Sequence, residues 1–253
     1  MASSPLLELQ GISLSFKGVK AITNISFAVA RGEICALIGP NGAGKSSLLN
    51  VINGVYQADA GLIGFNGASY RRMRSHQAAR QGIAHTFQNI ALFKGMSVLD
   101  NVLTGRNLKV KSSWVEQVLG IGRASADEAA QRRKAEEVID FLHINQWRNS
   151  IVYGLQKRVE LARALAAEPS LLLLDEPMAG MNSEEKAEMS RFILDTQREF
   201  GTTIVLIEHD IGVVMNLSDH IVVLDYGRKV GDGTPDEVRN NPEVIAAYLG
   251  VKH

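Results

Sequence analysis

Apolar and polar residues alternate along this chain with two different periods, one typical of β-strands and one typical of helices. Residues 6–16 and 22–29 carry apolar side chains in the manner of β-strands, and residues 34–38 form a short apolar run typical of a buried strand. From residue 154 onward, stretches with the helical spacing alternate with short apolar runs. We therefore expect helices at 154–167, 184–200 and 211–217, and strands at 171–174, 203–207 and 220–224. This alternation predicts a largely parallel sheet.

The segment between residues 92 and 150 has a different pattern. It contains no convincing strand, and its apolar residues recur every three or four positions, which favours helices. They are Val98, Val102, Leu103, Ala135, Val138, Ile139 and Leu142. We interpret the segment as a helical subdomain inserted into an α/β core. Before it we expect a helix at 45–53, a polar helical stretch at 71–81 and a strand at 83–87, and within it residues 109–123 look irregular.

Composition narrows the class of protein further. The chain has 253 residues, 45% of them hydrophobic, with 27 acidic and 27 basic side chains. The balanced charge gives no electrostatic reason to expect a nucleic-acid partner, and no apolar run approaches the roughly 20 residues that span a bilayer. The first ten residues lack a signal-peptide pattern. The single cysteine, Cys35, lies among apolar residues, so we expect an inert core thiol in a reducing, cytoplasmic compartment.

A complete phosphate-binding motif follows the run at 34–38. Residues 39–46 are Gly-Pro-Asn-Gly-Ala-Gly-Lys-Ser, which matches G-x-x-x-x-G-K-[ST] in full. The glycines let the backbone curl so that its N–H groups point at phosphate oxygens. Lys45 is expected to neutralise the β- and γ-phosphates, and the Ser46 hydroxyl to bind Mg²⁺. The alternative is a chance glycine turn, but the motif stands between a strand and a helix, as its function requires.

Two carboxylates end the apolar run that begins at residue 171. Asp175 can hold Mg²⁺ through water, and Glu176 can orient and activate an attacking water. The alternative is that both only cap the next helix. Further along, His209 follows the strand expected at 203–207, where ligands bind in parallel sheets, which makes it a candidate γ-phosphate contact. Taken alone, His209 could equally be structural, and Gln88 could be an ordinary loop residue.

Taken together, these motifs resemble those of ABC (ATP-binding cassette) ATPases over essentially the whole chain. Residues 39–46 correspond to the Walker A loop and 171–176 to Walker B. Gln88, in Thr-Phe-Gln-Asn, resembles the Q-loop glutamine, and His209 the switch histidine. Residues 179–182 resemble the D-loop. The resemblance implies a P-loop NTPase fold of the ABC type, with a RecA-like core, an antiparallel β subdomain and an inserted α-helical subdomain.

The resemblance also implies a division of the chain and a set of site residues. Residues 1–91 would form the nucleotide-binding core with the β subdomain, 92–152 the helical subdomain, and 153–253 the rest of the core. Glu176, His209 and Gln88 would be catalytic, and Ser46, Gln88 and Asp175 would hold Mg²⁺. ATP would contact Phe16, Gly39, Asn41, Gly42, Gly44, Lys45, Ser46, Ser47 and Gly154. Phe16 would stack on adenine, although it could also be a core residue.

The signature segment is the weakest part of the resemblance. Residues 158–165 match the helix that follows the family's L-S-G-G-Q stretch, whereas the first five positions match poorly. The alignment puts Val152 in the serine position, Tyr153 at the first glycine and Gly154 at the second. Val152 cannot donate a hydrogen bond, so the Gly154 N–H and the helix N-terminus would carry the anion contact. Either the cassette pairs with a paralogue that has an intact signature, or a homodimer is slow until membrane subunits align it.

Several details resemble the branch of cassettes that drive import of branched-chain amino acids. They are the Gly82-Ile83 pair before Thr-Phe-Gln-Asn, the Tyr153-Gly154 pair, Ile-Glu-His-Asp at 207–210, the long segment at 92–150 and the ending from residue 233 to Tyr-Leu-Gly at 248–250. The nearest rival is the lipopolysaccharide-exporter ATPase. A soluble ABC ATPase that acts on DNA or ribosomes is a further alternative, although sustained heptads and a second cassette are both missing.

This resemblance implies how such a cassette works. Two cassettes pair head to tail and trap two ATP molecules, so that each ATP lies on one Walker A loop and faces the other subunit's signature. The partners would be membrane permease subunits, a second cassette and a solute-binding protein. The chain would be a peripheral protein on the cytoplasmic face of the plasma membrane. ATP shifts the dimer towards its closed form by binding that form preferentially.

Overall fold

The computed structural model describes residues 4–86, 92–93, 95–110, 124–144 and 153–249 of the chain. Its backbone divides into two compact units. The first unit joins the two ends of the sequence, residues 1–85 and 170–253, and the second is the continuous segment 86–169. The helical unit is therefore an insertion in the α/β unit, as the sequence predicts.

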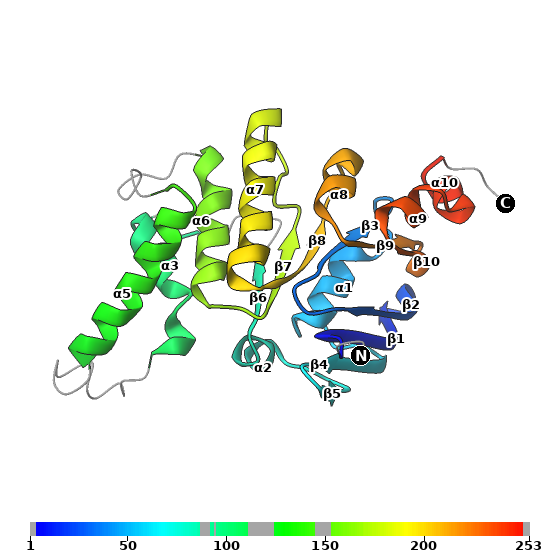
Figure 1. The fold of residues 1–253 in the computed structure, drawn as a ribbon. Helices are drawn as coiled ribbons and strands as arrows, with labels where there is room; N and C mark the ends of the chain where they lie inside the picture. Colours follow the sequence, from blue (N-terminus) through cyan, green and yellow to red (C-terminus); the bar gives the residue numbers. More distant parts are fainter. Residues whose placement is uncertain (1–3, 87–91, 94, 111–123, 145–152, 250–253) are drawn as a thin grey trace. The chain divides into compact units, whose positions relative to one another are not determined.

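A six-stranded sheet forms the centre of the first unit (Figure 1). Its order is β10-β9-β3-β8-β7-β6, and β3, β7, β8 and β9 are parallel, while β10 runs antiparallel to β9. The strands are β3 (Ile34–Ile38), β6 (Ile83–Thr86), β7 (Leu171–Asp175), β8 (Thr203–Ile207), β9 (His220–Asp225) and β10 (Arg228–Gly233).

Continuous burial explains why these apolar runs become central strands. All five residues of β3, of β7 and of β8 are buried, which is the pattern of a parallel sheet covered on both faces. Cys35 lies within β3 and is fully buried, and burial raises the pKa of its thiol. It is a core residue with an inert thiol, as expected from the sequence.

A second, antiparallel sheet belongs to the same unit. Its order is β2-β1-β4-β5, formed by β1 (Leu7–Phe16), β2 (Val19–Val29), β4 (Ala60–Phe65) and β5 (Ala68–Tyr70). Residues of β1 alternate between the core and the surface, because one face of an antiparallel sheet can remain solvated. The buried residues of this sheet continue into the core of the central sheet.

The first unit has six described helices. They are α1 (Lys45–Ile52), α2 (Ser75–Arg80), α7 (Ser183–Phe200), α8 (Ile211–Leu217), α9 (Pro235–Arg239) and α10 (Pro242–Leu249). Of these, α1, α2, α7 and α8 lie close to where the sequence predicts them. The helix expected at 71–81 is shorter, because Arg74 is its extended N-cap. The sequence did not predict β10, α9 or α10. The Thr-Pro-Asp-Glu run at 234–237 signals the start of α9, since Thr234 is its N-cap, Pro235 its first residue, and Thr234 and Glu237 form a capping box.

The second unit contains α3 (Val98–Thr104), the short 3₁₀ turn η1 (Asn107–Lys109), α5 (Ala124–Phe141) and α6 (Tyr153–Ala166). Helices α3 and α6 approach closely where α3 ends. A Cβ added at Gly105 would lie 2.0 Å from the carbonyl oxygen of Arg163, so only glycine fits between the two backbones. The sequence-based division ends the helical subdomain at residue 152, whereas in the structure α6 packs within the helical unit.

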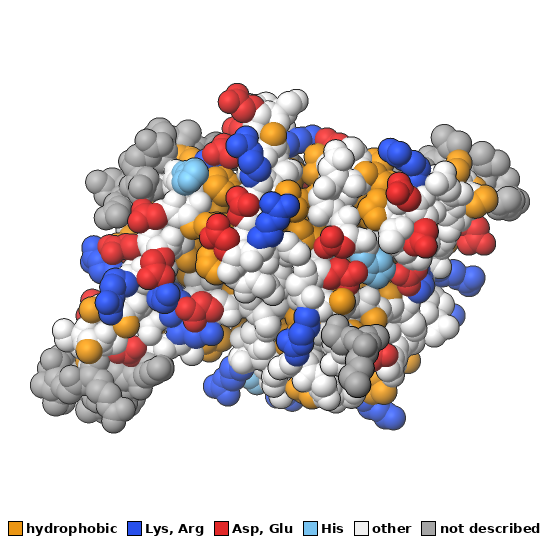
Figure 2. All heavy atoms as spheres, in the orientation of Figure 1, with side chains coloured by type: hydrophobic (Ala, Val, Ile, Leu, Met, Phe, Trp, Pro, Cys, Tyr) orange, Lys and Arg blue, Asp and Glu red, His pale blue; other side chains and the backbone are white. Residues whose placement is uncertain are grey.

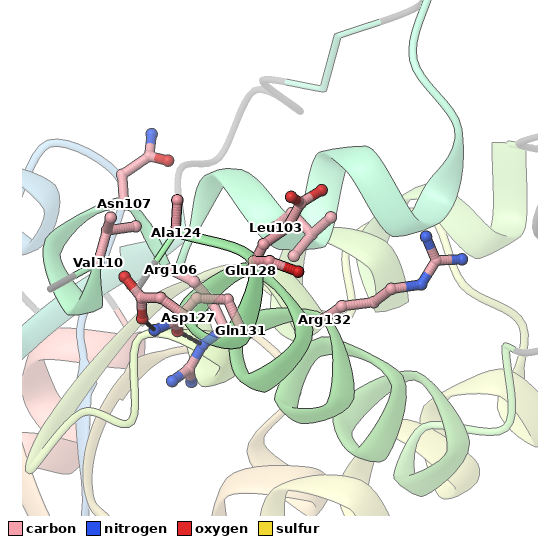
Figure 3. Close-up of a pocket in the computed structure, with 10 residues that line it drawn as sticks. Leu103, Arg106, Asn107, Val110, Ala124, Asp127, Glu128, Gln131 and Arg132 are labelled. Carbon is pink, nitrogen blue, oxygen red and sulfur yellow. Dashed lines mark hydrogen bonds between the residues drawn. The ribbon is translucent and has the colours of Figure 1, made fainter. Parts of the chain in front are cut away.

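A buried arginine connects the three α-helices that the structure describes in this unit. The Arg106 guanidinium donates to Gln131 Oε1 on α5 at 2.6 Å and to the carbonyl of Ala166 at the end of α6 at 2.7 Å. Gln131 Nε2 in turn donates to Asp127 at 2.9 Å. Figure 3 shows these side chains beside a cavity of about 360 Å³. The rest of its lining is Leu103, Asn107, Val110, Ala124, Ser125, Glu128 and Arg132.

The charges on the surface are mixed. Figure 2 shows acidic and basic side chains interspersed on the visible face, in keeping with the equal numbers of both in the sequence. Among the helices that the structure describes, none has the length and apolar character needed to cross a membrane.

Candidate nucleotide-binding and hydrolysis site

The glycine-rich loop connects the end of β3 to the start of α1. Gly44 is the N-cap of α1 and has a left-handed backbone, φ 96°, and a Cβ there would lie 2.7 Å from the carbonyl of Ala21. At Gly39 a Cβ would lie 2.0 Å from the carbonyl of Leu224. Both positions require glycine, because the surrounding backbone leaves no space for a side chain. The loop thus presents its N–H groups at a helix N-terminus, which favours anions.

The hairpin between β9 and β10 supports this loop through a backbone hydrogen bond. The Gly227 N–H donates to the carbonyl of Ala43 at 3.1 Å, and the Gly227 carbonyl accepts from the N–H of Thr23 on β2 at 2.7 Å. The loop is therefore tied to segments from both ends of the sequence. Asn41 and Gly42 are exposed, and Ser47 is half-buried on α1.

Lys45 is the buried cation of the loop. Its ammonium donates to the carbonyl oxygens of Gly39 at 2.7 Å and Pro40 at 2.9 Å, and the residue is only 6% exposed. Burial lowers the pKa of this ammonium, and the nearby Glu176 and Asp175 carboxylates oppose the shift. The hydrogen bonds that the structure gives this ammonium go to neutral carbonyl oxygens, which a phosphate oxygen could replace.

The sheet register brings the remaining candidates to the same edge. Asp175 pairs with Ile207, and Ile207 pairs with Leu37, so β3, β7 and β8 end at the same level. The Ser46 Oγ lies 3.4 Å from Asp175 Oδ1. A hydroxyl and a carboxylate are hard oxygen donors of the kind that Mg²⁺ prefers, and Mg²⁺ typically takes few protein ligands besides phosphate and water. The two side chains therefore fit a magnesium ion.

Glu176 and His209 meet directly. His209 Nε2 lies 2.7 Å from Glu176 Oε1. Glu176 has a left-handed backbone, φ 52°, and its N–H donates to the carbonyl of Ile207 at 3.0 Å. A non-glycine residue in this conformation is strained, and such strain concentrates at functional sites.

Glu208 is a residue of this site to which the sequence analysis assigned no role. Its carboxylate accepts from the Met178 N–H at 2.8 Å and from the His209 N–H at 3.3 Å, and the residue is 6% exposed. Burial raises its pKa, and the hydrogen bonds from Met178 and His209 counteract that shift. Glu208 thus holds the loop after Glu176 against the backbone of His209. In the sequence, the position of Glu208 next to His209 is the one signal that it belongs to the site. The sequence does not show that the carboxylate binds the backbone of Met178.

Phe16 lies at the end of β1 and is 42% exposed, so it is not a core residue. Its ring packs edge-on against Tyr56, with ring centroids 5.0 Å apart and planes at 76°. Tyr56 follows α1, and its N–H donates to the carbonyl of Asn50 at 3.0 Å. The contact joins the phosphate-loop helix to the β1–β2 hairpin, and no local pattern in the sequence predicts this pairing of two aromatic residues.

Two expectations lie partly or wholly outside the described residues. Gln88 and Val152 are not described. The backbone of Gly154 lies in the first turn of α6, which begins at Tyr153. The contact expected between the Gly154 N–H and a phosphate stays a prediction.

The fold and this site define a P-loop ATPase with a helical insertion. Residues 22–179, more than half of the chain, match the family model described as ABC transporter. The chain therefore belongs to the ABC transporter family, as an ATP-binding subunit that hydrolyses ATP. A second family model, described as branched-chain amino acid ATP-binding cassette transporter, matches residues 228–253.

Characterised relatives cover nearly the whole chain. It is 36% identical over 255 residues to the high-affinity branched-chain amino acid transport ATP-binding protein BraF of Pseudomonas aeruginosa, covering 98% of this chain and 99% of the relative. It is 37% identical over 252 residues to LivG of Escherichia coli, a protein of the same description, with the same coverage. These relatives confirm the resemblance to the branched-chain amino acid importer cassettes.

Solved structures confirm the ABC ATPase fold. The ADP conformation of MJ1267, an ATP-binding cassette of an ABC transporter, superposes with a TM-score of 0.84 at 29% identity and covers 98% of this chain and 100% of that one. A nucleotide-free cassette from an ABC transporter gives a TM-score of 0.83 at 28% identity, covering 96% of this chain and 98% of that chain.

Proposed function

We propose that this chain powers the import of branched-chain amino acids or similar small solutes by hydrolysing ATP. The observation that carries the proposal is the placement of Glu176 and His209, in hydrogen-bond contact beside the Walker A loop at the shared edge of β3, β7 and β8. The choice of solute is supported by the relatives and by the match of residues 228–253 to the branched-chain cassette model.

Each side chain of the site has a proposed role in hydrolysis. Ser46, Asp175 and Gln88 would hold Mg²⁺, which neutralises phosphate charge when bound. Lys45 would exchange the carbonyls of Gly39 and Pro40 for oxygens of the β- and γ-phosphates, since a full negative charge attracts the ammonium more strongly. Phe16 would stack on adenine, with Tyr56 against its ring.

Glu176 is the proposed general base. Its carboxylate would orient the attacking water and accept its proton, while His209 would hold that carboxylate and contact the γ-phosphate. The strained backbone of Glu176 supports this role, because the conformation aims the carboxylate and is retained although it costs stability.

The proposed assembly places the chain at the cytoplasmic face of the plasma membrane. There it would dock on permease subunits that work with a solute-binding protein, and pair with a second cassette across two ATP molecules. Gly154 would offer its N–H to the ATP held by the partner cassette. Because Val152 stands in the serine position, the partner would be either a paralogue with an intact signature or a copy that depends on the permease for alignment.

Substitutions at Lys45 and Glu176 test the hydrolytic core of the proposal. Lys45→Ala should weaken ATP binding and abolish ATPase activity. Glu176→Gln should keep ATP binding but lower hydrolysis by about 10²- to 10⁴-fold, since it keeps the shape and removes the base. The measurements are binding of a fluorescent ATP analogue to the isolated subunit and phosphate release by the assembled transporter.

Glu199→Gln is the matched control, because it makes the same change at an exposed position near the end of α7. It should leave both readouts unchanged. An active Glu176→Gln enzyme would move the base elsewhere, with His209 as the next candidate. For the solute, ATP hydrolysis in proteoliposomes should rise with binding protein loaded with leucine. Stimulation only by an unrelated solute would contradict the proposed substrate class.

A further inference from the structure

Two chain segments meet just beyond the ends of β7 and β8. The Glu176 N–H donates to the carbonyl of Ile207 at 3.0 Å, directly after the last pair in the register of these strands. Further out, Glu176 Oε1 lies 2.7 Å from His209 Nε2. The proposed base and the histidine thus face each other from two loops that have left the sheet, where the register of β7 and β8 no longer fixes the distance between them.

Glu208 joins these two loops where the strand pairing stops. Its Oε1 accepts from the N–H of Met178 at 2.8 Å, and its Oε2 accepts from the N–H of His209 at 3.3 Å. The left-handed backbone of Glu176, φ 52°, lies between the end of β7 and Met178. One carboxylate therefore links the backbone just after the proposed base to the backbone of the histidine that contacts it.

Met178 is the fixed end of this link. Its side chain is buried, and its sulfur accepts from the Ser190 hydroxyl on α7 at 3.7 Å. The His209 side chain, in contrast, is 46% exposed. A side chain that is nearly half exposed depends on its backbone for its direction, and Glu208 holds that backbone against a buried residue.

A carboxylate is a costly group with which to make this link. Burial raises the pKa of Glu208, the hydrogen bonds from Met178 and His209 lower it, and the neighbouring charge of Glu176 raises it further. A buried anion next to a second carboxylate opposes folding, so the stability of the chain does not account for its presence. Charged groups in such surroundings concentrate where they serve a reaction.

We propose that Glu208 is a positioning residue for ATP hydrolysis, whose carboxylate holds His209 at the distance from Glu176 that the reaction needs. The inference rests on the proposed function, in which Glu176 is the base and His209 its partner. Glu208 is buried and acts through two backbone N–H groups, so we assign it no contact with the nucleotide or the attacking water.

Two substitutions remove the acceptor atoms in steps. Glu208→Gln keeps the shape but replaces one acceptor oxygen by an NH₂ group, which cannot accept from an N–H. It should lower ATP turnover of the assembled transporter by about 10- to 100-fold, since a misplacement of about 1 Å can cost that much. Glu208→Ala removes both acceptors and should lower turnover further. The affinity of the isolated subunit for a fluorescent ATP analogue should stay within about twofold, because the link serves the reaction and not binding.

A double substitution separates positioning from general stability. If Glu208 acts through His209, its loss should matter little once that histidine is gone, because residues that act as a unit are not additive. In a His209→Ala transporter, Glu208→Gln should therefore reduce the residual turnover by less than about twofold. Release of labelled γ-phosphate from ATP measures this residual rate.

Glu237→Gln is the matched control. It makes the same change at a carboxylate that also accepts from a backbone N–H, that of Thr234 at 2.8 Å. The preceding residue, Gly233, pairs with Ile221 near the start of β9, so the control lies at the opposite edge of the sheet from Glu208. It should leave turnover at the wild-type level. The Tm of every variant sets the assay temperature, so that unfolded chain is not counted as lost turnover.

The results that would overturn the inference are distinguishable. Normal turnover of Glu208→Gln beside an impaired His209→Ala would refute the inference and leave the proposed function intact. Losses that multiply in the double variant would mean that Glu208 does not act through His209. A fall in ATP affinity as large as the fall in turnover would mean that Glu208 shapes the nucleotide site. Normal turnover of His209→Ala would refute the role that the proposed function gives this histidine, and the inference with it.

Discussion

Burial and one hydrogen bond together determine the protonation state of His85. It lies on β6, and its Nδ1 is 3.1 Å from the side-chain nitrogen of Asn53, the C-cap of the phosphate-loop helix. An amide nitrogen can only donate, so Nδ1 accepts and the imidazole is neutral. Burial lowers the pKa of His85 to about 4. The pair links the helix that would bind phosphate to the strand that leads towards Gln88.

Asn53→Asp should reverse this hydrogen bond. A carboxylate at position 53 would accept from Nδ1 and stabilise the protonated ring, so the pKa of His85 should rise by one or more units from about 4. NMR titration of the ring protons measures the shift.

Asn53→Ala is the control for this shift, because it removes the hydrogen bond and adds no charge. There the pKa of His85 should stay low, since burial is its cause. An equal rise in both variants would mean that the amide, and not burial, depresses the pKa. Because the folded-state pKa of the wild type lies below the usual 6.5, His85 costs stability only as the pH falls below about 6.5.

At the scale of elements, the close approach of α3 and α6 governs the helical unit. Gly105→Ala should destabilise this unit by about 1–3 kcal/mol, because its Cβ would lie 2.0 Å from a backbone carbonyl that cannot move without shifting α6. Hydrogen exchange at the amides of α3 and α6 measures the loss of protection.

Gly95→Ala is the matched control within the same unit. A Cβ at Gly95 meets nothing within 4 Å, so protection of α3 and α6 should be unchanged. Equal protection in the Gly105→Ala variant would show that the two helices can separate at little cost, and that their contact does not hold the unit together.

Elements that follow from a contiguous sequence motif or from apolar periodicity were predictable from the sequence. Elements and contacts that depend on residues far away in the sequence were not. The strand and helix around the Walker A loop follow from one contiguous motif, and β8 and α8 have the bounds expected for them. The strand β10 is Arg-Lys-Val-Gly-Asp-Gly, which has little strand character and forms only because it pairs with β9. Glu208 and Tyr56 were missed because their partners, Met178 and Phe16, lie far away in the sequence.

At the scale of the whole chain, His220 joins segments from distant parts of the sequence. Its Nε2 lies 2.6 Å from Asp232 Oδ1 on β10, and its Nδ1 lies 3.4 Å from Glu33 Oε1, just before β3. The hydrogen bond with Asp232 raises the pKa of His220, and the negative charge of Glu33 raises it further. Burial and the positive charge of Lys229 lower it, but the net shift is upward. Burial by itself would raise the pKa of Asp232. The hydrogen bonds from His220 and Lys229 outweigh burial, so the pKa of Asp232 is lowered.

The raised pKa of His220 predicts how stability varies with pH. Protonated His220 stabilises the folded chain fully below about pH 6.5, the unfolded value, and this contribution disappears as the pH rises through the folded-state pKa. His220→Gln should therefore lower the Tm more at pH 6 than at pH 9. His76→Gln, at an exposed position on α2, should change the Tm equally little at both. A pH-independent loss for His220→Gln would contradict the role of its charge.

The position of β3 in its sheet has a consequence for the newly made chain. Its two neighbours are β8 and β9, which the ribosome produces only after residue 200, although β3 itself ends at residue 38. At about 5–20 residues per second, the wait is on the order of ten seconds. Throughout that time an apolar strand has both edges unpaired, which invites association with other chains. We therefore expect the yield of this protein to rise with chaperones that cover exposed strands until the last fifth of the chain, with β8 and β9, has emerged.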